Sequence, residues 1–147
     1  MKRIRATVAV LAASLAFAGD SIAASAPATD AARLATQYSD WAGGRSNSDS
    51  LVAGLRSGAP ITLVTNGANR SVSIAGFTPA SSMSYGSVGA ALSNAQRSLA
   101  RVGINQPTAE QIQAAVIGGE VVTASGATTM VKGSVAPRAT TTPVASR

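Results

Sequence analysis

Alanine, rather than any large side chain, supplies almost half of the apolar residues of this chain. The 147 residues include 31 alanines but only 36 residues of the types Val, Ile, Leu, Met, Phe, Trp and Tyr. Because an alanine removes little apolar surface from water when it is buried, so few large side chains can build only a small core. A chain of this length has room for one domain. We therefore expect a single small domain of low stability.

The first 24 residues are typical of a secretory signal peptide. Three basic residues lie within the first five, an uncharged apolar run occupies residues 6–19, and small residues dominate positions 21–26. Basic, apolar and small-residue segments in this order direct export and are then removed. The apolar run is shorter than the roughly 20 residues that a membrane-spanning helix needs, so no stable membrane span is expected after cleavage. We predict cleavage near Ala24, a periplasmic or secreted protein, and a mature net charge of +4 instead of +6.

Four segments have apolar residues at helical spacing. The most regular is 87–102, where apolar residues recur every three or four positions. Residues 109–117 follow a capping box formed by Thr108 and Gln111, in which each side chain bonds the backbone amide of the other. Shorter helices are predicted at 30–41 and 47–56.

Two further regions have the alternation of β-hairpins. Residues 60–65 and 70–75 flank an Asn-Gly turn, which is a strong hairpin signal. In this hairpin Ile61 and Leu63 are expected to face one side, with Val72 and Ile74 opposite them on the second strand. The other predicted hairpin pairs residues 120–123 with residues 128–131.

These segments predict an α+β fold of about four short helices packed with one or two hairpins. The last residues are rich in Ala, Pro and Thr and contain few large apolar side chains, which is typical of a disordered tail. The predicted organisation is a signal peptide at 1–24, a small α+β domain at 25–132 and a disordered tail at 133–147.

The residue types that catalysis and metal binding need are missing or scattered. The chain has no His and no Cys, which excludes a Ser-His-Asp triad, a thiol nucleophile and thiolate metal sites. Lys132 is the only lysine after residue 24 and belongs to no Ser-x-x-Lys pattern. We therefore expect no enzyme activity, no metal and no cofactor. A hydrolase with a carboxylate pair that the sequence does not reveal stays open as an alternative.

A nucleic-acid partner is not expected either. The order helix, turn, helix, hairpin over residues 87–131 is that of a winged helix, in which the second helix reads DNA. A reading helix needs side chains that reach bases and phosphates, and residues 109–117 contain no Arg or Lys.

Five residues are candidate ligand contacts. Arg97 and Arg101 lie one turn apart on the predicted helix and suit phosphate or carboxylate groups, the alternative being a solvated helix face. Tyr38, Trp41 and Tyr85 are expected to form the bulky centre of an alanine-rich core. The competing interpretation is a partly exposed aromatic groove that holds a glycan or an extended peptide.

Several short motifs are spread over residues 35–130 of the chain. They are Tyr38, Trp41-Ala42-Gly43, the helix from Leu51 to Gly58, Phe77-Thr78-Pro79, Tyr85-Gly86, Ala91-Leu92-Ser93, Gln96, Leu99-Ala100, Gly103-Ile104 and Pro107-Thr108-Ala109-Glu110-Gln111. In these motifs the chain resembles a group of small exported proteins of Gram-negative bacteria that have no assigned activity. The resemblance implies export and a small α+β fold, and it implies no catalytic residue.

These observations favour an exported, non-catalytic, envelope-associated binding or interaction protein, with an envelope protein or a glycan as its partner. Two alternatives remain besides this one. The first is a small secreted effector or inhibitor that docks on another protein. The second is the hydrolase with an unrecognised carboxylate site.

Overall fold

The described part of the chain runs helix, helix, hairpin, helix, helix, hairpin. The computed structural model describes residues 26–67 and 70–139, so the predicted signal peptide at 1–24 lies outside the described residues. The helices are α1 (Ala26–Tyr38), α2 (Arg45–Ser57), α3 (Tyr85–Arg101) and α4 (Ala109–Ile117), and the strands are β1 (Ile61–Asn66), β2 (Val72–Phe77), β3 (Gly119–Val122) and β4 (Thr128–Val131). The predicted α+β fold of four helices and two antiparallel hairpins is confirmed.

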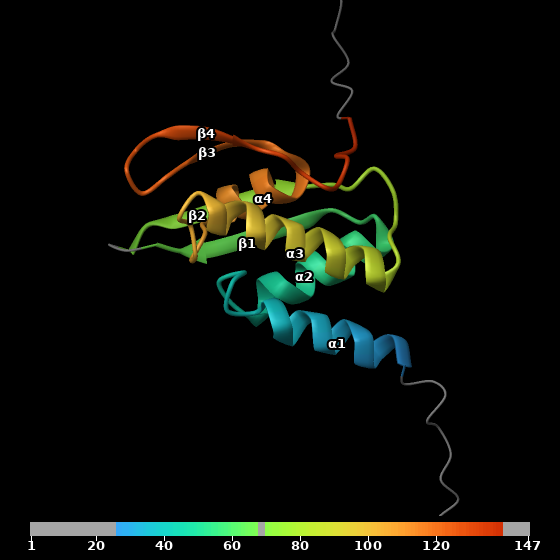
Figure 1. Ribbon diagram of the computed structural model, residues 1–147. Coiled ribbons are helices and arrows are strands. Elements are labelled where there is room, and N and C mark those ends of the chain that lie inside the picture. Colours follow the sequence, from blue (N-terminus) through green and yellow to red (C-terminus); the bar gives the residue numbers. More distant parts are fainter. Residues whose placement is uncertain (1–25, 68–69, 140–147) are drawn as a thin grey trace, which may run out of the picture.

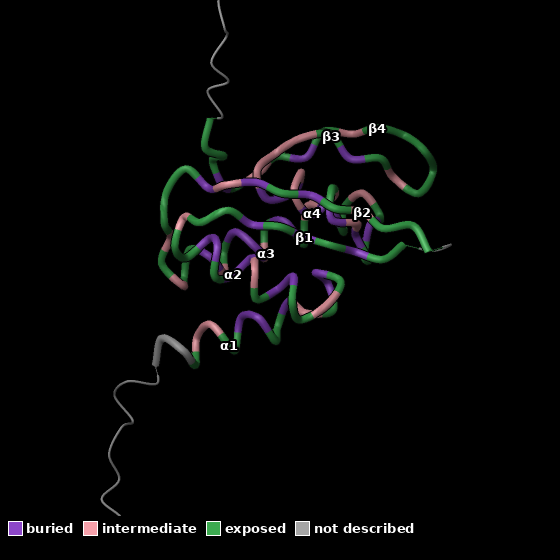
Figure 2. The backbone as a smooth tube through the Cα atoms, turned by 180° about the vertical axis from the view of Figure 1, so that it is seen from behind, coloured by how far each residue is buried: buried purple, intermediate pink, exposed green. Residues whose placement is uncertain are grey.

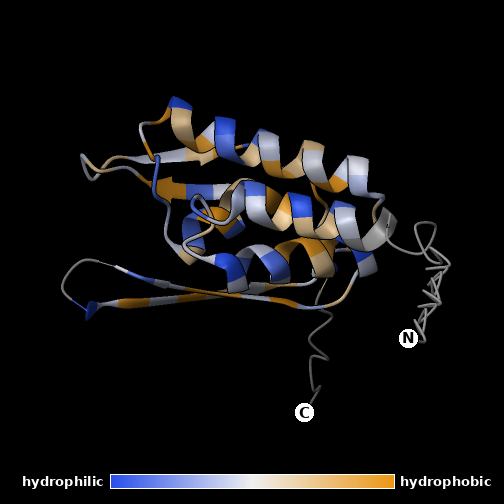
Figure 3. Cartoon of the chain, turned by 90° about the horizontal axis from the view of Figure 1, so that it is seen from below, coloured by the Kyte–Doolittle hydropathy of each residue, from blue (hydrophilic) through white to orange (hydrophobic). Residues whose placement is uncertain are grey.

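The helices and hairpins are stacked around one core. Helix α1 packs on α2, α2 packs on β1, and α4 lies between β2 and the second hairpin, while α3 packs across the other three helices (Figure 1). Buried and exposed residues alternate along β1, and the helices carry hydrophilic and hydrophobic faces (Figures 2 and 3). The fully buried large side chains include Leu51, Leu63, Leu92, Leu99 and Ile112.

Helices α3 and α4 begin where side chains satisfy their first backbone amides. The Ser84 hydroxyl accepts the amide of Ser87 at 3.2 Å, so α3 starts two residues before its predicted start. The predicted capping box of α4 is confirmed: the Gln111 amide donates to the Thr108 hydroxyl at 3.4 Å, and the Thr108 amide donates to Gln111 Oε1 at 2.9 Å. In both helices, therefore, the starting position follows from a side chain that lies three residues before the backbone amide it bonds.

Helix α1 differs from its predicted range of 30–41. It begins at Ala26 and ends at Tyr38, after which the chain turns through Gly43 and Gly44, both at positive φ. The Gly44 amide donates to the carbonyl of Ser39 at 2.8 Å and closes this turn. The apolar spacing predicted Trp41 as the last helical residue, but its side chain enters the core from the turn.

The first hairpin has a register that differs from the predicted one. Paired residues of antiparallel strands lie on the same face of a sheet. Val64, Val72 and Ile74 occupy the outer face and are 45%, 58% and 63% exposed. The register pairs Ile61 with Phe77, Leu63 with Ala75, Thr65 with Ser73, Val64 with Ile74 and Asn66 with Val72.

The predicted placement of Val72 and Ile74 opposite Ile61 and Leu63 is therefore wrong. The connection between the strands covers residues 67–71, one residue more than the predicted turn, with Arg70 at φ 59°. Leu63 pairs with Ala75 instead of Val72, so the register differs by three residues, and any odd shift turns the side chains of a strand to the other face. The second hairpin has the predicted strands, with β3 beginning one residue earlier.

The domain extends beyond the predicted boundary at residue 132. The amides of Ser134 and Val135 donate to the carbonyl of Val116 at 2.9 and 3.0 Å, and Val135 is buried. Pro137 then pairs with Pro79 in an antiparallel bridge. The prediction of a disordered tail is wrong for residues 133–139, because backbone bonds hold a segment that has few large side chains. Residues 140–147 of the predicted tail lie outside the described residues.

Candidate anion-binding groove

Tyr38 and Trp41 belong to the core rather than to an exposed groove. The two residues are 2% and 5% exposed, and their rings meet edge to face with centroids 6.2 Å apart. The Tyr38 hydroxyl donates to the carbonyl of Gly89 at 3.2 Å, which joins α1 to α3. The prediction that these two rings belong to the core is confirmed. Because neither ring exposes a face, neither can stack on a sugar.

Tyr85 is separate from this aromatic pair. It is half-buried at the start of α3, and the Arg56 guanidinium lies 5.1 Å from the centroid of its ring. This arrangement is a cation–π contact between α2 and α3. The predicted aromatic residues therefore do not converge on one ligand site.

Arg97 and Arg101, in contrast, lie in a polar hollow together with Lys132. Both arginines project from the last two turns of α3, and Lys132 directly follows β4. All three residues are exposed. The hollow has a volume of about 330 Å³, and we call it the basic groove. It is lined by Asn94, Arg97, Ser98, Arg101, Lys132, Gly133 and Ser134.

Close backbone packing positions the Lys132 side of the basic groove. A Cβ atom on Gly133 would overlap the backbone of Ile117 and Gly118, so the chain after β4 approaches the end of α4 more closely than any larger residue permits. The bonds from Ser134 and the next residue to the carbonyl of Val116 hold this approach in place. Lys132 and Ser134 are thereby fixed beside α3.

The cations of the basic groove lack a carboxylate counter-charge. Arg97 donates from Nε to the carbonyl of Ser93 at 3.3 Å and from Nη2 to Asn94 Oδ1 at 3.0 Å, which holds its side chain along the helix. No hydrogen bond or ion pair joins Arg101 or Lys132 to another side chain in the described residues. The ion pairs of that part of the chain are formed elsewhere, by Arg33 with Asp30 and by Arg45 with Asp49.

The sequence predicted Arg97 and Arg101 as candidate contacts but missed Lys132 and Ser134. The sequence predicts Lys132 as the last residue of the domain and places residues 133–134 in the tail, and no local pattern links these residues to α3. The sequence did indicate that Lys132 is held in place, because it directly follows a predicted strand. It did not indicate that this strand ends beside α3, because tertiary packing alone determines that.

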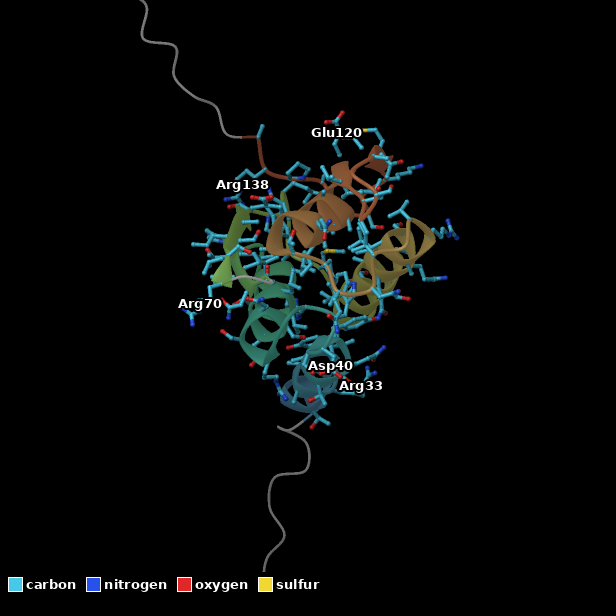
Figure 4. The ribbon with its side chains drawn as sticks, turned by 90° about the vertical axis from the view of Figure 1, so that its left-hand side faces the viewer. Arg33, Asp40, Arg70, Glu120 and Arg138 are labelled. Carbon is cyan, nitrogen blue, oxygen red and sulfur yellow. The ribbon has the colours of Figure 1, made fainter. Side chains whose placement is uncertain are left out.

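The carboxylates are dispersed over the surface. Asp40 lies at one end of the molecule and Glu120 at the opposite end (Figure 4). Within residues 26–67 and 70–139, no three acidic residues gather at a point where they could hold a metal ion. Asp40 borders a second polar hollow of about 470 Å³, which is also lined by Trp41, Thr65, Asn66, Gln106 and Thr108.

Comparison of the chain with protein-family models, with curated proteins and with solved structures finds no match. Among the described helices, none is long and apolar enough to cross a bilayer.

Proposed function

We propose that the protein is an exported, non-catalytic binding protein that holds an anionic group of an envelope glycan in the basic groove. The observation that carries this proposal is the convergence of three cationic side chains from two distant segments of the chain, with no carboxylate in the lining. Export rests on the order of segments in residues 1–24.

The charge arrangement favours an anion as the missing partner. Like charges brought together repel one another, and a bound anion converts that repulsion into attraction. Arginine offers a planar set of donors that fits two oxygens of a phosphate or carboxylate at once, whereas lysine acts as a point charge. Arg97 and Arg101 lie one turn apart on α3, a spacing at which both can bind the same group.

The neutral lining favours a sugar as the carrier of that anion. Asn94, Ser98 and Ser134 add an amide and two hydroxyls, which are groups that exchange hydrogen bonds with sugar hydroxyls. The volume of about 330 Å³ is at the small end of the range for sites that bind small molecules, and it suits one phosphorylated sugar unit.

Isothermal titration calorimetry of the exported protein with glucose 6-phosphate, inorganic phosphate and glucose tests the proposal. We expect glucose 6-phosphate to bind more tightly than phosphate, and glucose alone not to bind. The double variant Arg97→Ala/Arg101→Ala should bind glucose 6-phosphate at least about tenfold more weakly, because each charge-assisted bond contributes about 1.5–3 kcal/mol.

A matched double variant separates this site from general attraction to positive charge. Arg33→Ala/Arg138→Ala removes the same charge from two other places on the surface (Figure 4) and should leave the affinity within about twofold. Equal weakening by both double variants would contradict a specific site. If a single-stranded oligonucleotide binds more tightly than glucose 6-phosphate, the partner is a nucleic acid and not a glycan.

A further inference from the structure

Strand β1 ends in an asparagine that a glycine follows directly. Asn66 is the last residue of β1, and both Asn66 and Gly67 are exposed. The chain has five asparagines, and Asn66 is the one that a glycine follows. Asparagine is a thermolabile residue type, because the next backbone nitrogen can attack its side-chain carbonyl carbon. Glycine has no Cβ atom, so it leaves this nitrogen less shielded than any other residue does.

The reaction that such a pair undergoes is deamidation, and it consumes only water. The nitrogen of Gly67 bonds to Cγ of Asn66, the bond from Cγ to Nδ2 breaks, and ammonia leaves with the proton of the Gly67 amide. The product is a five-membered succinimide ring. Water then opens the ring at one of its two carbonyl carbons, which gives aspartate or isoaspartate at position 66. No atom is oxidised or reduced in either step.

The folded hairpin holds the reacting groups in an unproductive arrangement. The Gly67 amide donates to the carbonyl of Ser71 at 2.7 Å, so its proton is already engaged. Asn66 pairs with Val72 in the register of the hairpin, which keeps the Asn66 backbone extended. Ring closure requires this backbone to rotate out of the extended conformation. Both the hydrogen bond and the strand pairing must therefore break before Asn66 reacts.

We propose that Asn66 is a site of spontaneous deamidation, and that the folded hairpin slows the reaction without preventing it. The end of a hairpin opens at a smaller cost in free energy than the centre of a domain does. Asn94 and Asn105 are exposed as well, but a residue with a Cβ atom follows each of them. Asn47 is buried, and three hydrogen bonds hold its side chain.

Deamidation changes the polar hollow that Asp40 borders. Asn66 and Gly67 both line this hollow, and no lysine or arginine is among the described residues of its lining. The new carboxylate therefore places a second negative charge in the hollow without a neighbouring cation. Isoaspartate also adds one carbon atom to the main chain directly after Thr65, whose hydroxyl accepts the first amide of α4.

Peptide mass spectrometry of the purified protein, incubated at mildly alkaline pH, tests the site. Deamidation raises the mass of the peptide that contains Asn66 by the difference between an amide and a carboxylic acid. In the folded protein, Asn66 should react at least about threefold faster than Asn105, which is the internal control. In concentrated urea, Asn66 should react at least about fivefold faster than in the folded protein, because the bond to Ser71 and the pairing with Val72 are lost.

The variant Gly67→Ala tests the attacking nitrogen separately from the fold. In urea, where the hairpin is absent, this variant should slow the reaction at Asn66 at least about tenfold, because a Cβ atom now shields the nitrogen. The rate at Asn105 should stay the same. A rate at Asn66 no higher than that at Asn105 in the folded protein would overturn the site. Equal rates at Asn66 in the folded and the unfolded protein would overturn the protection by the hairpin.

Discussion

The side chain of Asn47 connects three parts of the fold, and its removal should destabilise the domain strongly. Asn47 is 6% exposed and lies in the first turn of α2. Its Nδ2 atom donates to the carbonyls of Ala42 and Val64 at 2.7 and 2.8 Å, and its Oδ1 atom accepts the amide of Val64 at 3.0 Å. These bonds join the turn after α1, the start of α2 and the outer edge of β1.

The magnitude follows from the number of bonds that Asn47→Ala removes. Each hydrogen bond contributes about 0.5–1.5 kcal/mol net, so the loss of three costs about 3 kcal/mol. Small domains have total stabilities of about 5–15 kcal/mol. With a urea dependence of about 1–3 kcal/mol per molar, the midpoint of unfolding should fall by at least about 1 M at an unchanged slope.

The assay is equilibrium urea unfolding followed by circular dichroism, with Asn94→Ala as the matched control. Asn94 is an exposed residue of α3 whose side chain accepts one bond from Arg97. The change of residue type and the gain in helix propensity are the same at both sites. The control should change stability by less than about 0.5 kcal/mol. If Asn47→Ala has an equally small effect, water replaces the three bonds, and the hydrogen bonds of Asn47 do not stabilise the fold.

Four further outcomes are expected. Leu99→Ala should cost about 2–5 kcal/mol in urea unfolding, because this side chain is fully buried. Thr65→Val should cost about 1–3 kcal/mol, because the Thr65 hydroxyl accepts the first amide of α4 at 2.8 Å. Gly54→Ala should lower the melting temperature despite its better helix propensity, because the added methyl group would overlap the side chain of Ile61. If the predicted signal peptide is cleaved, mass spectrometry should place the first residue of the mature protein near Ala24 or Ser25, and an intact Met1 would contradict the signal peptide.

The elements that the sequence predicted correctly are those that depend on residues close together in the chain. Helix α3 carries its buried residues at the spacing seen in the sequence, and α4 begins at the capping box formed by Thr108 and Gln111. Such features depend on residues three or four positions apart, which any helix brings together. The second hairpin was also predicted, because β-branched residues flank a short turn.

Features that depend on distant residues were not predicted. The connection in the first hairpin begins one residue later and is one residue longer than the predicted turn, and the resulting three-residue change of register turns Val72 and Ile74 to the outer face. Lys132 reaches the basic groove only because Gly133 packs against the end of α4. Residues 133–139 join the domain through backbone bonds, and composition carries no information about those.

The return of residues 133–139 to the end of α4 and to residues 78–80, which follow β2, also imposes a time order on folding. A chain emerges from the ribosome with its N-terminal end first. The carbonyl of Thr78 is therefore free until the amide of Arg138, 60 residues later in the chain, becomes available. Contacts between such distant residues form late, because a large loop must close first. We expect a chain that stalls or ends before residue 133 to leave residues 78–80 without their backbone partners, and proteases to cut it there.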